Sequence, residues 1–478
     1  LIYKVDKKNS KGYFLLFCLK GNIIMKKISI IGLPIILIII LIITLITGHK
    51  INKQNSASKK KEIFNLTQQL QSKNNQISIV QKFFLQRNEN INDVISPNNI
   101  NFSEIFKDKN LGDFNNYSIS KYKTNDVLFN ANIKAVASAY IDFYNNDNEI
   151  ILVTYDGILA IGKLSNINKF KKIRSNITSL VKFEDFYISD QYGVKDILID
   201  NDLIYVSLIT EKEQDCFNLK IIKSKINKEF LDFEIFYETS QCVNKKNEHG
   251  FLAHQGGGGR MVKKDDNSII FTTGEFRNRP LAQDVNSEFG KILNIDTVSK
   301  EAKIISMGHR NPQGLYYSKK HDFIISTEHG PKGGDEINLN INPMEQTKNF
   351  GWPLSSYGEH YYKNYSKEIL EQAPLNNSHK DYGFTEPVKY FVPSIGISEI
   401  VPLDKNDAEF FVGAMGSEIV EKDLGLHYIL LDTNKKKVVD HKYVLLNERV
   451  RDMAVSKDRR TIILFLETSG SLAIIKKN

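Results

Sequence analysis

The chain has few cysteines, one tryptophan and no dense positive charge in its long C-terminal part. The three cysteines do not form the Cys-x-x-Cys-His pattern that attaches haem, so no covalent haem is expected. Residues 1–61 hold 12 Lys and one Asp, which leaves 52 basic and 55 acidic residues for 62–478. The C-terminal part therefore lacks the basic surface of a nucleic-acid-binding protein, and no nucleic-acid partner is expected.

Two of the cysteines flank a predicted hairpin. Cys216 and Cys242 lie on either side of two apolar segments, 217–226 and 230–237. Opposed positions on paired strands bring side chains close enough for a disulfide. We expect this bond if the domain lies outside the cytoplasm, and the alternative is two unrelated buried thiols.

One apolar run, residues 28–47, is long and uncharged. Its length of 20 residues suffices to cross a bilayer core. No clear cleavage site follows, so the sequence predicts an uncleaved signal anchor, a transmembrane helix over 25–49, rather than a cleaved signal peptide. Lysines flank both ends, so the positive-inside rule gives weak guidance. Met25 fits a start, and residues 1–24 are interpreted as an upstream leader.

Residues 50–132 are predicted to be a polar, partly helical connector. Residues 59–90 carry a rough apolar stripe at helical spacing, which indicates a stalk helix or a coiled coil. Residues 91–132 are rich in Asn and read as an irregular linker.

From about residue 133 one pattern recurs six times: an apolar strand, a polar turn and a second apolar strand. Period-2 strands at this spacing predict an all-β fold, a six-bladed β-propeller over residues 133–478, with two β-sandwiches as the alternative. The longest interval contains the only tryptophan, Trp352, and has room for an insertion that shapes a binding site. The turns centre on Asn146, Asn201, Asp266, Lys320, Asn406 and Asp458.

Two polar runs, 308–314 and 328–336, flank one predicted hairpin, so both are expected at one end of one sheet. In the first run, the Arg310 guanidinium offers bidentate donors to a carboxylate or a quinone oxygen, unless it only ties two loops together. In the second, Gly330 and Pro331 offer backbone carbonyls of the kind that Ca²⁺ prefers, unless they only form a turn.

Two other places carry candidate functional groups. His254 precedes a glycine run, 256–259, where an imidazole can act as a base, although most such histidines are surface residues. Strand alternation puts Arg449 and Arg451 on one face. Their repulsion requires a counter-charge, either the neighbouring Asp452 or Glu448 or a polyanionic ligand.

Together these segments resemble the soluble PQQ-dependent aldose sugar dehydrogenases, the glucose/sorbosone dehydrogenase family. That family is a six-bladed propeller that binds pyrroloquinoline quinone (PQQ) and Ca²⁺. The resemblance covers roughly residues 180–470. It is carried by GHRNPQGL (308–315), EHGPKGGDEIN (328–338), NFGWP (349–353) and NERVRD (447–452), with support from AQD (282–284) and GKIL (290–293).

The resemblance implies a role for each candidate. His254 would remove the proton of the sugar's anomeric hydroxyl, and Arg310 would stabilise negative charge on the quinone oxygen. Gly330 and Pro331 would donate carbonyls to the Ca²⁺. The cofactor would further be held by Asn311, Arg449 and Arg451, with Gln191 near the base.

Two departures from the family pattern stand out. Five residues separate His254 from Arg260, an apparent insertion of two. Gly416 stands where the family often has a lysine that meets a cofactor carboxylate, and Lys422 is a candidate substitute. The loss of one such contact is expected to weaken cofactor binding.

The sequence therefore predicts a membrane-anchored quinoprotein facing the periplasm that oxidises an aldose or a similar alcohol. Electrons would pass to a separate acceptor, a quinone or a cytochrome. The alternatives are a non-catalytic carbohydrate- or protein-binding propeller that has lost the cofactor, and a Ca²⁺-dependent lactonase-like propeller.

Overall fold

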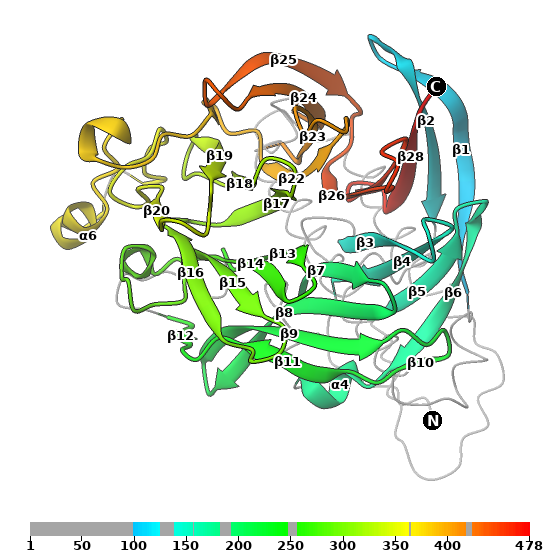
Figure 1. The fold of residues 1–478 in the computed structure, drawn as a ribbon, viewed down its shortest axis with the longest axis horizontal. Coiled ribbons are helices and arrows are strands. Elements are labelled where there is room, and N and C mark those ends of the chain that lie inside the picture. The colour runs from blue at the N-terminus through cyan, green and yellow to red at the C-terminus, as the bar shows by residue number, and fades with distance from the viewer. Residues whose placement is uncertain are drawn as a thin grey trace, which may run out of the picture. The chain divides into compact units, whose positions relative to one another are not determined.

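A computed structural model describes residues 99–124, 138–155, 157–181, 193–246, 256–362, 365–416 and 423–478. All of these belong to one of the two compact units into which the chain divides, Leu70–Asn478. Strands dominate the described residues, so the predicted all-β class is confirmed (Figure 1). The described helices are short: α4 (Ile177–Leu180), η4 (Arg279–Ala282), α6 (Lys367–Gln372) and η5 (Lys380–Tyr382).

The described strands form five hydrogen-bonded sheets. The largest has ten strands. It contains β1 (Asn99–Leu111), β2 (Phe114–Thr124), β3 (Ala139–Tyr144), β4 (Glu149–Thr154), β5 (Leu159–Lys163), β6 (Asn166–Ser175), β10 (Phe230–Leu231), β26 (Val450–Val455), β27 (Thr461–Leu466) and β28 (Ser471–Lys477).

The next two sheets follow in chain order and have five strands each. The first contains β7 (Gly193–Asp200), β8 (Leu203–Glu213), β9 (Cys216–Lys225), β11 (Glu234–Glu238) and β12 (Val243–Asn244). The second contains β13 (Gly258–Asp265), β14 (Ser268–Thr273), β15 (Lys291–Asp296), β16 (Ala302–Met307) and β20 (Lys348–Asn349).

The remaining two sheets have four strands each. The first contains β17 (Pro312–Ser318), β18 (Phe323–Glu328), β19 (Asp335–Ile341) and β21 (Lys389–Phe391). The second contains β22 (Ile397–Pro402), β23 (Glu409–Ala414), β24 (Gly425–Asp432) and β25 (Lys437–Leu445).

Six strands form a closed cycle of contacts: β3, β7, β13, β17, β22 and β26, with β26 returning to β3. Their labels surround the middle of the ring in Figure 1. One hydrophobic cluster lies between each pair of neighbours in this cycle, so the apolar core is divided among six interfaces. Two β-sandwiches would not produce such a cycle, and the arrangement is that of a propeller.

Each of the six predicted hairpins is present, as β3–β4, β7–β8, β13–β14, β17–β18, β22–β23 and β26–β27. The polar turn residues have a physical reason. Asn146 (φ 52°), Asn201 (φ 54°) and Asp407 (φ 54°) adopt left-handed backbone, which Asn and Asp tolerate better than most residues.

The interpretation of 91–132 as an irregular linker is wrong for residues 99–124. β2 pairs with β28 over seven residues, from Tyr117↔Lys477 to Lys123↔Ser471, so an N-terminal strand lies beside the C-terminal one. The sequence does not show β1 as a strand because its pairing with β2 contains register shifts near Glu104, Phe106 and Lys109. These shifts interrupt the alternation of buried and exposed side chains.

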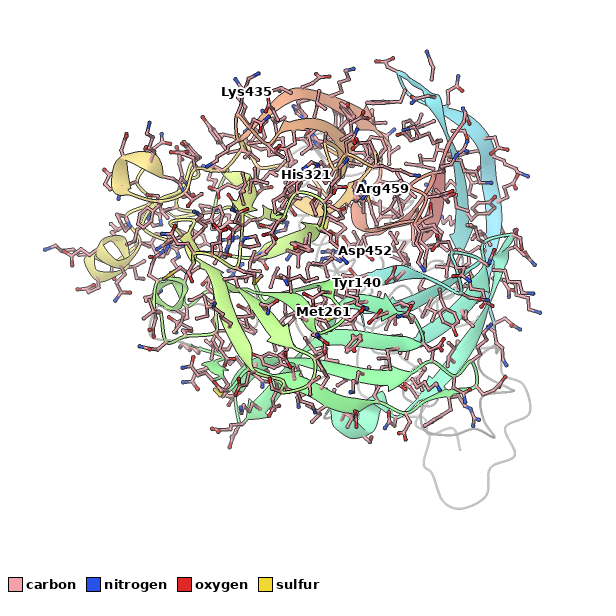
Figure 2. The ribbon with its side chains drawn as sticks, viewed as in Figure 1. Tyr140, Met261, His321, Lys435, Asp452 and Arg459 are labelled. Atoms are coloured by element: carbon pink, nitrogen blue, oxygen red, sulfur yellow. A yellow bond between two sulfur atoms is a disulfide. The ribbon has the colours of Figure 1, made fainter. Side chains whose placement is uncertain are left out.

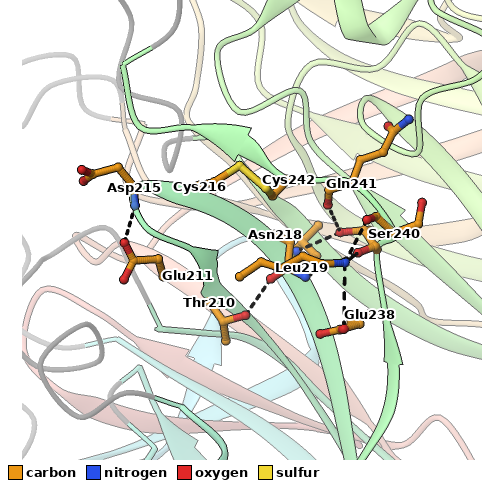
Figure 3. The surroundings of a disulfide bond; sticks show 12 residues. Thr210, Glu211, Asp215, Cys216, Asn218, Leu219, Glu238, Ser240, Gln241 and Cys242 are labelled. Carbon is orange, nitrogen blue, oxygen red and sulfur yellow. Dashed lines mark hydrogen bonds and ion pairs between the residues drawn. A yellow bond between two sulfur atoms is a disulfide. The ribbon is translucent and has the colours of Figure 1, made fainter.

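The expected disulfide is confirmed: Cys216 and Cys242 are bonded, with their Cα atoms 5.4 Å apart (Figure 3). Cys216 begins β9, and Cys242 immediately precedes β12, which pairs with that same end of β9 through Val243↔Phe217. The bond thus fastens the two-residue strand β12 to its sheet.

No helix within the described ranges is long and apolar enough to span a membrane. The predicted anchor over 25–49 and the helical connector over 59–90 lie outside those ranges.

Candidate functional site

The predicted polar loops share one end of their sheets. In each sheet the start of the first strand pairs with the end of the second, as in Pro312↔Glu328, Ile397↔Ala414 and Val450↔Leu466. The segment before a first strand therefore lies beside the connection that leaves the second strand. The prediction that 308–314 and 328–336 meet at one end of a sheet is confirmed.

Arg310 is held in place from both sides. Its Nη1 donates to the His329 carbonyl (2.9 Å), and its amide donates to Oε1 of Glu328. The other Glu328 oxygen lies 2.9 Å from Nδ1 of the buried His309. The guanidinium also lies over Trp352, 5.5 Å from the ring centroid. Arg310 therefore ties the two loops together, which is the structural role given above as the alternative. Its guanidinium nevertheless lies among the residues predicted to form the site.

Asn311 connects this loop to the glycine run. Its Oδ1 accepts from the Gly258 amide (3.1 Å) and from Nε2 of Gln313 (2.9 Å). The glycines there are required by close packing rather than by flexibility. A Cβ at Gly259 would lie 2.3 Å from Cβ of Lys195, and Gly258 has φ +66°. His254 therefore precedes a packed strand start, although it lies outside the described residues, as does Gln191.

Gly330 and Pro331 belong to a tightly packed loop between β18 and β19. A Cβ at Gly330 would lie 2.1 Å from the Gly334 carbonyl oxygen, so only glycine fits. Asp335 is buried and accepts from the amides of Gly330 (3.0 Å), Ile395 (3.1 Å) and Ile397 (3.0 Å). Its carboxylate is committed to the backbone, so the candidate oxygen donors for a hard cation are the carbonyls of Gly330 and Pro331, of which the latter also lies 3.5 Å from Oγ of Ser394.

Arg449 and Arg451 share one carboxylate, which is Glu467. Arg449 Nε lies 2.9 Å from Oε2 of Glu467, and Arg451 Nη2 lies 2.7 Å from Oε1. The shared face was predicted correctly, but the expected counter-charges were wrong. Asp452 pairs with Arg260 (2.5 Å), and Glu448 pairs with Lys121 (2.5 Å).

The reason is geometric: β27 pairs with β26, and its end brings Glu467 onto the arginine face. Glu467 is 1% exposed, and burial alone would raise the pKa of its carboxyl, but Arg451 and Arg449 lower that pKa below its usual value. The pair of guanidiniums keeps a net charge of one, which is suited to an anionic ligand.

Next to Arg451, three buried carboxylates surround Arg260. Its Nη1 lies 3.0 Å from Asp196, 3.0 Å from Glu399 and 2.5 Å from Asp452. Asp452 lies near the middle of the ring in Figure 2, as does Tyr140, over whose ring Arg260 packs. The carboxylates are close enough together to hold a metal ion, but the guanidinium already supplies the cation.

Arg260 also links the predicted site residues. Its Nε donates to the Gln313 carbonyl (2.6 Å), and its Nη2 donates to the Arg451 carbonyl (3.2 Å). A chain of hydrogen bonds therefore runs from Asn311 through Gln313 and Arg260 to Arg451. The structure brings Arg310, Asn311, Arg449 and Arg451 into one region.

Two groups in this region were missed from the sequence. Glu275 is 1% exposed, its Oε2 has no hydrogen-bond partner among the described residues, and burial raises its pKa to about 7. Its amide donates to the Arg310 carbonyl (2.9 Å). His329 has a buried Nε2 that is likewise unpartnered within the described ranges, and burial lowers its pKa. Only the position of Glu275 directly after a predicted strand could have drawn attention to it.

The long insertion, within the interval between the turns at Lys320 and Asn406, reaches the site as expected. Arg279 packs over Trp352 (5.5 Å) and over Tyr365 (5.4 Å), and its Nη1 lies 3.2 Å from Nδ1 of His360. Trp352 is buried, both Arg279 and Arg310 pack over its ring, and its Nε1 has no partner among the residues described. Cations and aromatic rings therefore alternate along one side of the site.

These groups suit PQQ, a flat polycarboxylate, with Ca²⁺. Arg310, Arg449 and Arg451 supply cationic donors, and Trp352 and His329 hold buried nitrogens that lack partners within the described ranges. The loop of Gly330 and Pro331 supplies carbonyls. The donor set thus fits the cofactor that the resemblance implies.

Comparison with known proteins places the site in context. Residues 142–474 match the family model described as glucose/sorbosone dehydrogenase. The aldose sugar dehydrogenase YliI of Escherichia coli is 29% identical over 235 residues, which are 45% of this chain and 58% of that protein.

Two solved structures show the same fold. The apo-form of the soluble aldose sugar dehydrogenase from Escherichia coli has a TM-score of 0.56 at 20% identity, covering 71% of this chain and 96% of that one. The PQQ-bound aldose sugar dehydrogenase from Streptomyces coelicolor has a TM-score of 0.50 at 17% identity, covering 71% and 93%.

Proposed function

Because the chain belongs to the glucose/sorbosone dehydrogenase family, we propose that it is a PQQ- and Ca²⁺-dependent oxidoreductase that oxidises an aldose or a similar alcohol. One observation carries the proposal furthest. Arg310 and Arg451, from two different sheets, both lie near His329, which directly precedes Gly330 and Pro331, and Arg449 shares Glu467 with Arg451. A site with this charge and these donors fits an anionic quinone with a bound cation.

Each residue has a proposed role. PQQ, with Ca²⁺, would accept the electrons and the hydrogen released from the substrate's C–H bond. Arg310 would face the quinone oxygen and stabilise negative charge there. Gly330 and Pro331 would hold Ca²⁺ through their carbonyls. The remaining cofactor contacts are assigned to Gln191, Asn311, Arg449 and Arg451.

The proton of the substrate hydroxyl needs a base in the site, and His254 is proposed for this role. Glu275 is proposed to orient that base or to share its proton. Its carboxyl lies close to Gly256, two residues after His254, because a Cβ at Gly256 would come within 4.0 Å of Oε1. A buried carboxyl with a pKa near neutrality is suited to proton transfer.

Gly416 remains the main departure from the family. It has φ +65°, a backbone that a lysine would adopt only with strain. The Gly416 carbonyl oxygen lies 3.4 Å from Nη1 of Arg449. The Arg449 guanidinium therefore lies beside the position where the family often has a lysine. We expect PQQ affinity below that of a site with the lysine, by roughly one or two orders of magnitude. Lys422 lies outside the described residues.

Further expectations belong to this proposal. The closed cycle of six first strands supports six blades, with the ten-stranded sheet comprising two blades joined by β1. The apolar run at 28–47 supports a membrane anchor, and the Cys216–Cys242 disulfide supports a catalytic domain outside the cytoplasm, in the periplasm. Electrons would leave to a separate quinone or cytochrome.

The experiment is to reconstitute the purified protein with PQQ and Ca²⁺ and to measure dye reduction with a panel of aldoses. Activity that requires both additions supports the proposal. Arg310→Gln should lower kcat by about 10²- to 10³-fold. Lys319→Gln, an exposed cation at the other end of the β17–β18 hairpin, should leave it unchanged.

The missing lysine at position 416 favours a second candidate, a carbohydrate-binding propeller without the cofactor. Sugar binding without any PQQ-dependent dye reduction would support it. Lactone hydrolysis with Ca²⁺ and no quinone would instead indicate a lactonase.

A further inference from the structure

A turn beside Arg310 holds a cation that the proposed chemistry does not use. Residues 275–278 form this turn, closed by the Asn278 amide donating to the Glu275 carbonyl (2.8 Å). The turn is fixed to the site because the Glu275 amide donates to the Arg310 carbonyl and the Phe276 amide donates to the Gly256 carbonyl (3.3 Å). Arg277 sits at its tip.

The backbone of this turn is strained. Phe276 (φ 51°) and Arg277 (φ 58°) are both left-handed, as in a type I′ turn, in which Asn and Gly are the favoured residues. Strain of this kind persists where surrounding structure imposes it, and it gathers at ligand sites. Phe276 has a packing reason, since it is fully buried against Phe289 at 5.1 Å. Arg277 follows it in the same turn, is only half-buried, and makes no side-chain hydrogen bond or ion pair within the described ranges.

The positive charge of the Arg277 guanidinium is not neutralised by a salt bridge within the described ranges. No carboxylate there forms an ion pair with Arg277 or Arg310, whereas Arg260, Arg449 and Arg451 all have carboxylate partners. Burial and the neighbouring Arg310 lower the pKa of the Arg277 guanidinium, so the protein disfavours its charge. Glu275 opposes this shift, but it forms no ion pair with Arg277 within the described ranges and is partly protonated near neutral pH, because burial raises its pKa to about 7. An anion would relieve this repulsion.

Exposed aromatic rings accompany Arg277. Tyr361 and Tyr362 lie near enough to Arg277 to influence the pKa of its guanidinium, and they are 47% and 70% exposed. Exposed aromatic side chains beside a site commonly form ligand-binding surfaces. Because Tyr362 packs near Tyr365 (5.9 Å), the rings continue the wall formed by Arg279 and Trp352. Such a surface suits a sugar ring that carries a negative group.

We propose that Arg277 determines substrate specificity by binding the anionic group of an acidic aldose, either the carboxylate of a uronic acid or the phosphate of a sugar phosphate. The identity of the substrate class rests on the proposed function. The binding of the anion does not, because it requires neither PQQ nor turnover.

Trp352 provides a direct test, since it is the only tryptophan and lies against Arg310 and Arg279. The purified full-length protein without cofactor is titrated with glucuronate, glucose 6-phosphate and glucose while tryptophan fluorescence is followed. We expect at least one anion to bind about 10- to 100-fold more tightly than glucose, and the comparison of the two anions identifies the group.

The key variant is Arg277→Asn, which removes the charge while keeping a residue that tolerates left-handed backbone. It should lower the affinity for the preferred anion by about 10-fold or more and leave glucose binding unchanged. Arg277→Lys should retain most of the preference. Lys436→Asn makes the same change at an exposed left-handed position (φ 50°) in the β24–β25 turn and should change nothing.

Three results would overturn the inference: equal affinity for glucose and both anions, an unchanged anion affinity in Arg277→Asn, or a loss of PQQ affinity in that variant without a loss of anion affinity. The third result would show that Arg277 binds PQQ rather than the substrate. With PQQ and Ca²⁺ present, the same ratio should appear in kcat/KM. If PQQ fails to bind while the anion preference depends on Arg277, the proposed oxidation is wrong and the anion site stands.

Discussion

At the scale of single residues, the site is distinguished by charges that the protein stabilises poorly. Glu275 is buried with one oxygen unpartnered among the described residues, and Arg277 lies in strained backbone beside Arg310. Other charges of the site are matched, since Glu467 pairs with both Arg449 and Arg451. Unmatched groups that lie beside one another are typical of functional sites.

Glu275→Gln tests this contrast. Glutamine keeps the shape but has no charge to desolvate, so at about pH 8 the free energy of unfolding should rise by roughly 1–3 kcal/mol. The gain should disappear at low pH, because the carboxyl of Glu275 is then neutral in both states. If Glu275 takes part in proton transfer as proposed, Glu275→Gln should also lower kcat with PQQ by about 10²-fold or more.

Chemical denaturation and dye-linked kinetics measure the two effects. The exposed Glu359→Gln in the insertion is the matched control and should alter neither. A more stable Glu275→Gln with full activity would show that the carboxyl takes no part in the reaction.

At the scale of elements, hairpins were the most predictable feature. Turn residues such as Asn146 and Asn201 mark them because local backbone preference and alternating burial agree there. The placement of Arg449 and Arg451 on one face also followed from strand geometry. Their partner Glu467 did not, because it arrives from a neighbouring strand through pairing that the sequence does not display. β1 was missed because its bulges break the alternation.

The disulfide supports an element that is otherwise weakly held, since β12 has only two residues. The double variant Cys216→Ser with Cys242→Ser should lower the free energy of unfolding by about 3 kcal/mol, because the bond closes a loop of 26 residues in sequence separation. Chemical denaturation of the oxidised protein and the variant measures this. A reductant should destabilise the wild type and leave the variant unaffected.

At the scale of the whole molecule, the N-terminal strand β2 completes the sheet of the C-terminal strands. Ile119 lies in a hydrophobic cluster with Leu464 and Ile475, so β2 contributes to the core and not only to an edge. Ile119→Ala should lower the free energy of unfolding by about 2–4 kcal/mol. Lys123→Ala, on the same strand but exposed, should change it by less than about 0.5 kcal/mol. Equal effects would mean that β2 is dispensable for the fold.

The carboxylates around Arg260 make the stability of the ring depend on pH. Burial raises the pKa of Asp196 to about 7 and that of Glu399 to about 8. A carboxyl whose pKa is higher in the folded state than in the unfolded state binds its proton more tightly when the protein is folded. Its contribution to the free energy of unfolding is therefore full at low pH and is lost as the pH rises through about 8. The free energy of unfolding should therefore fall between about pH 5 and about pH 8.

Glu399→Gln should flatten this slope, since the glutamine has no proton to lose. The exposed Glu301→Gln, before β16, should keep the wild-type slope. An unchanged slope in Glu399→Gln would place the dependence elsewhere.

The central claim is that the end of the ring bearing Arg310, Arg449 and Arg451 binds PQQ. The direct measurement is a titration of the full-length protein with PQQ in the presence of Ca²⁺, followed by absorbance or calorimetry. We predict saturable binding of one PQQ per chain with a micromolar or lower Kd, weakened about 10-fold or more in Arg451→Gln. An absence of binding at micromolar concentrations, or equal binding by Arg310→Gln, Arg449→Gln and Arg451→Gln, would contradict it.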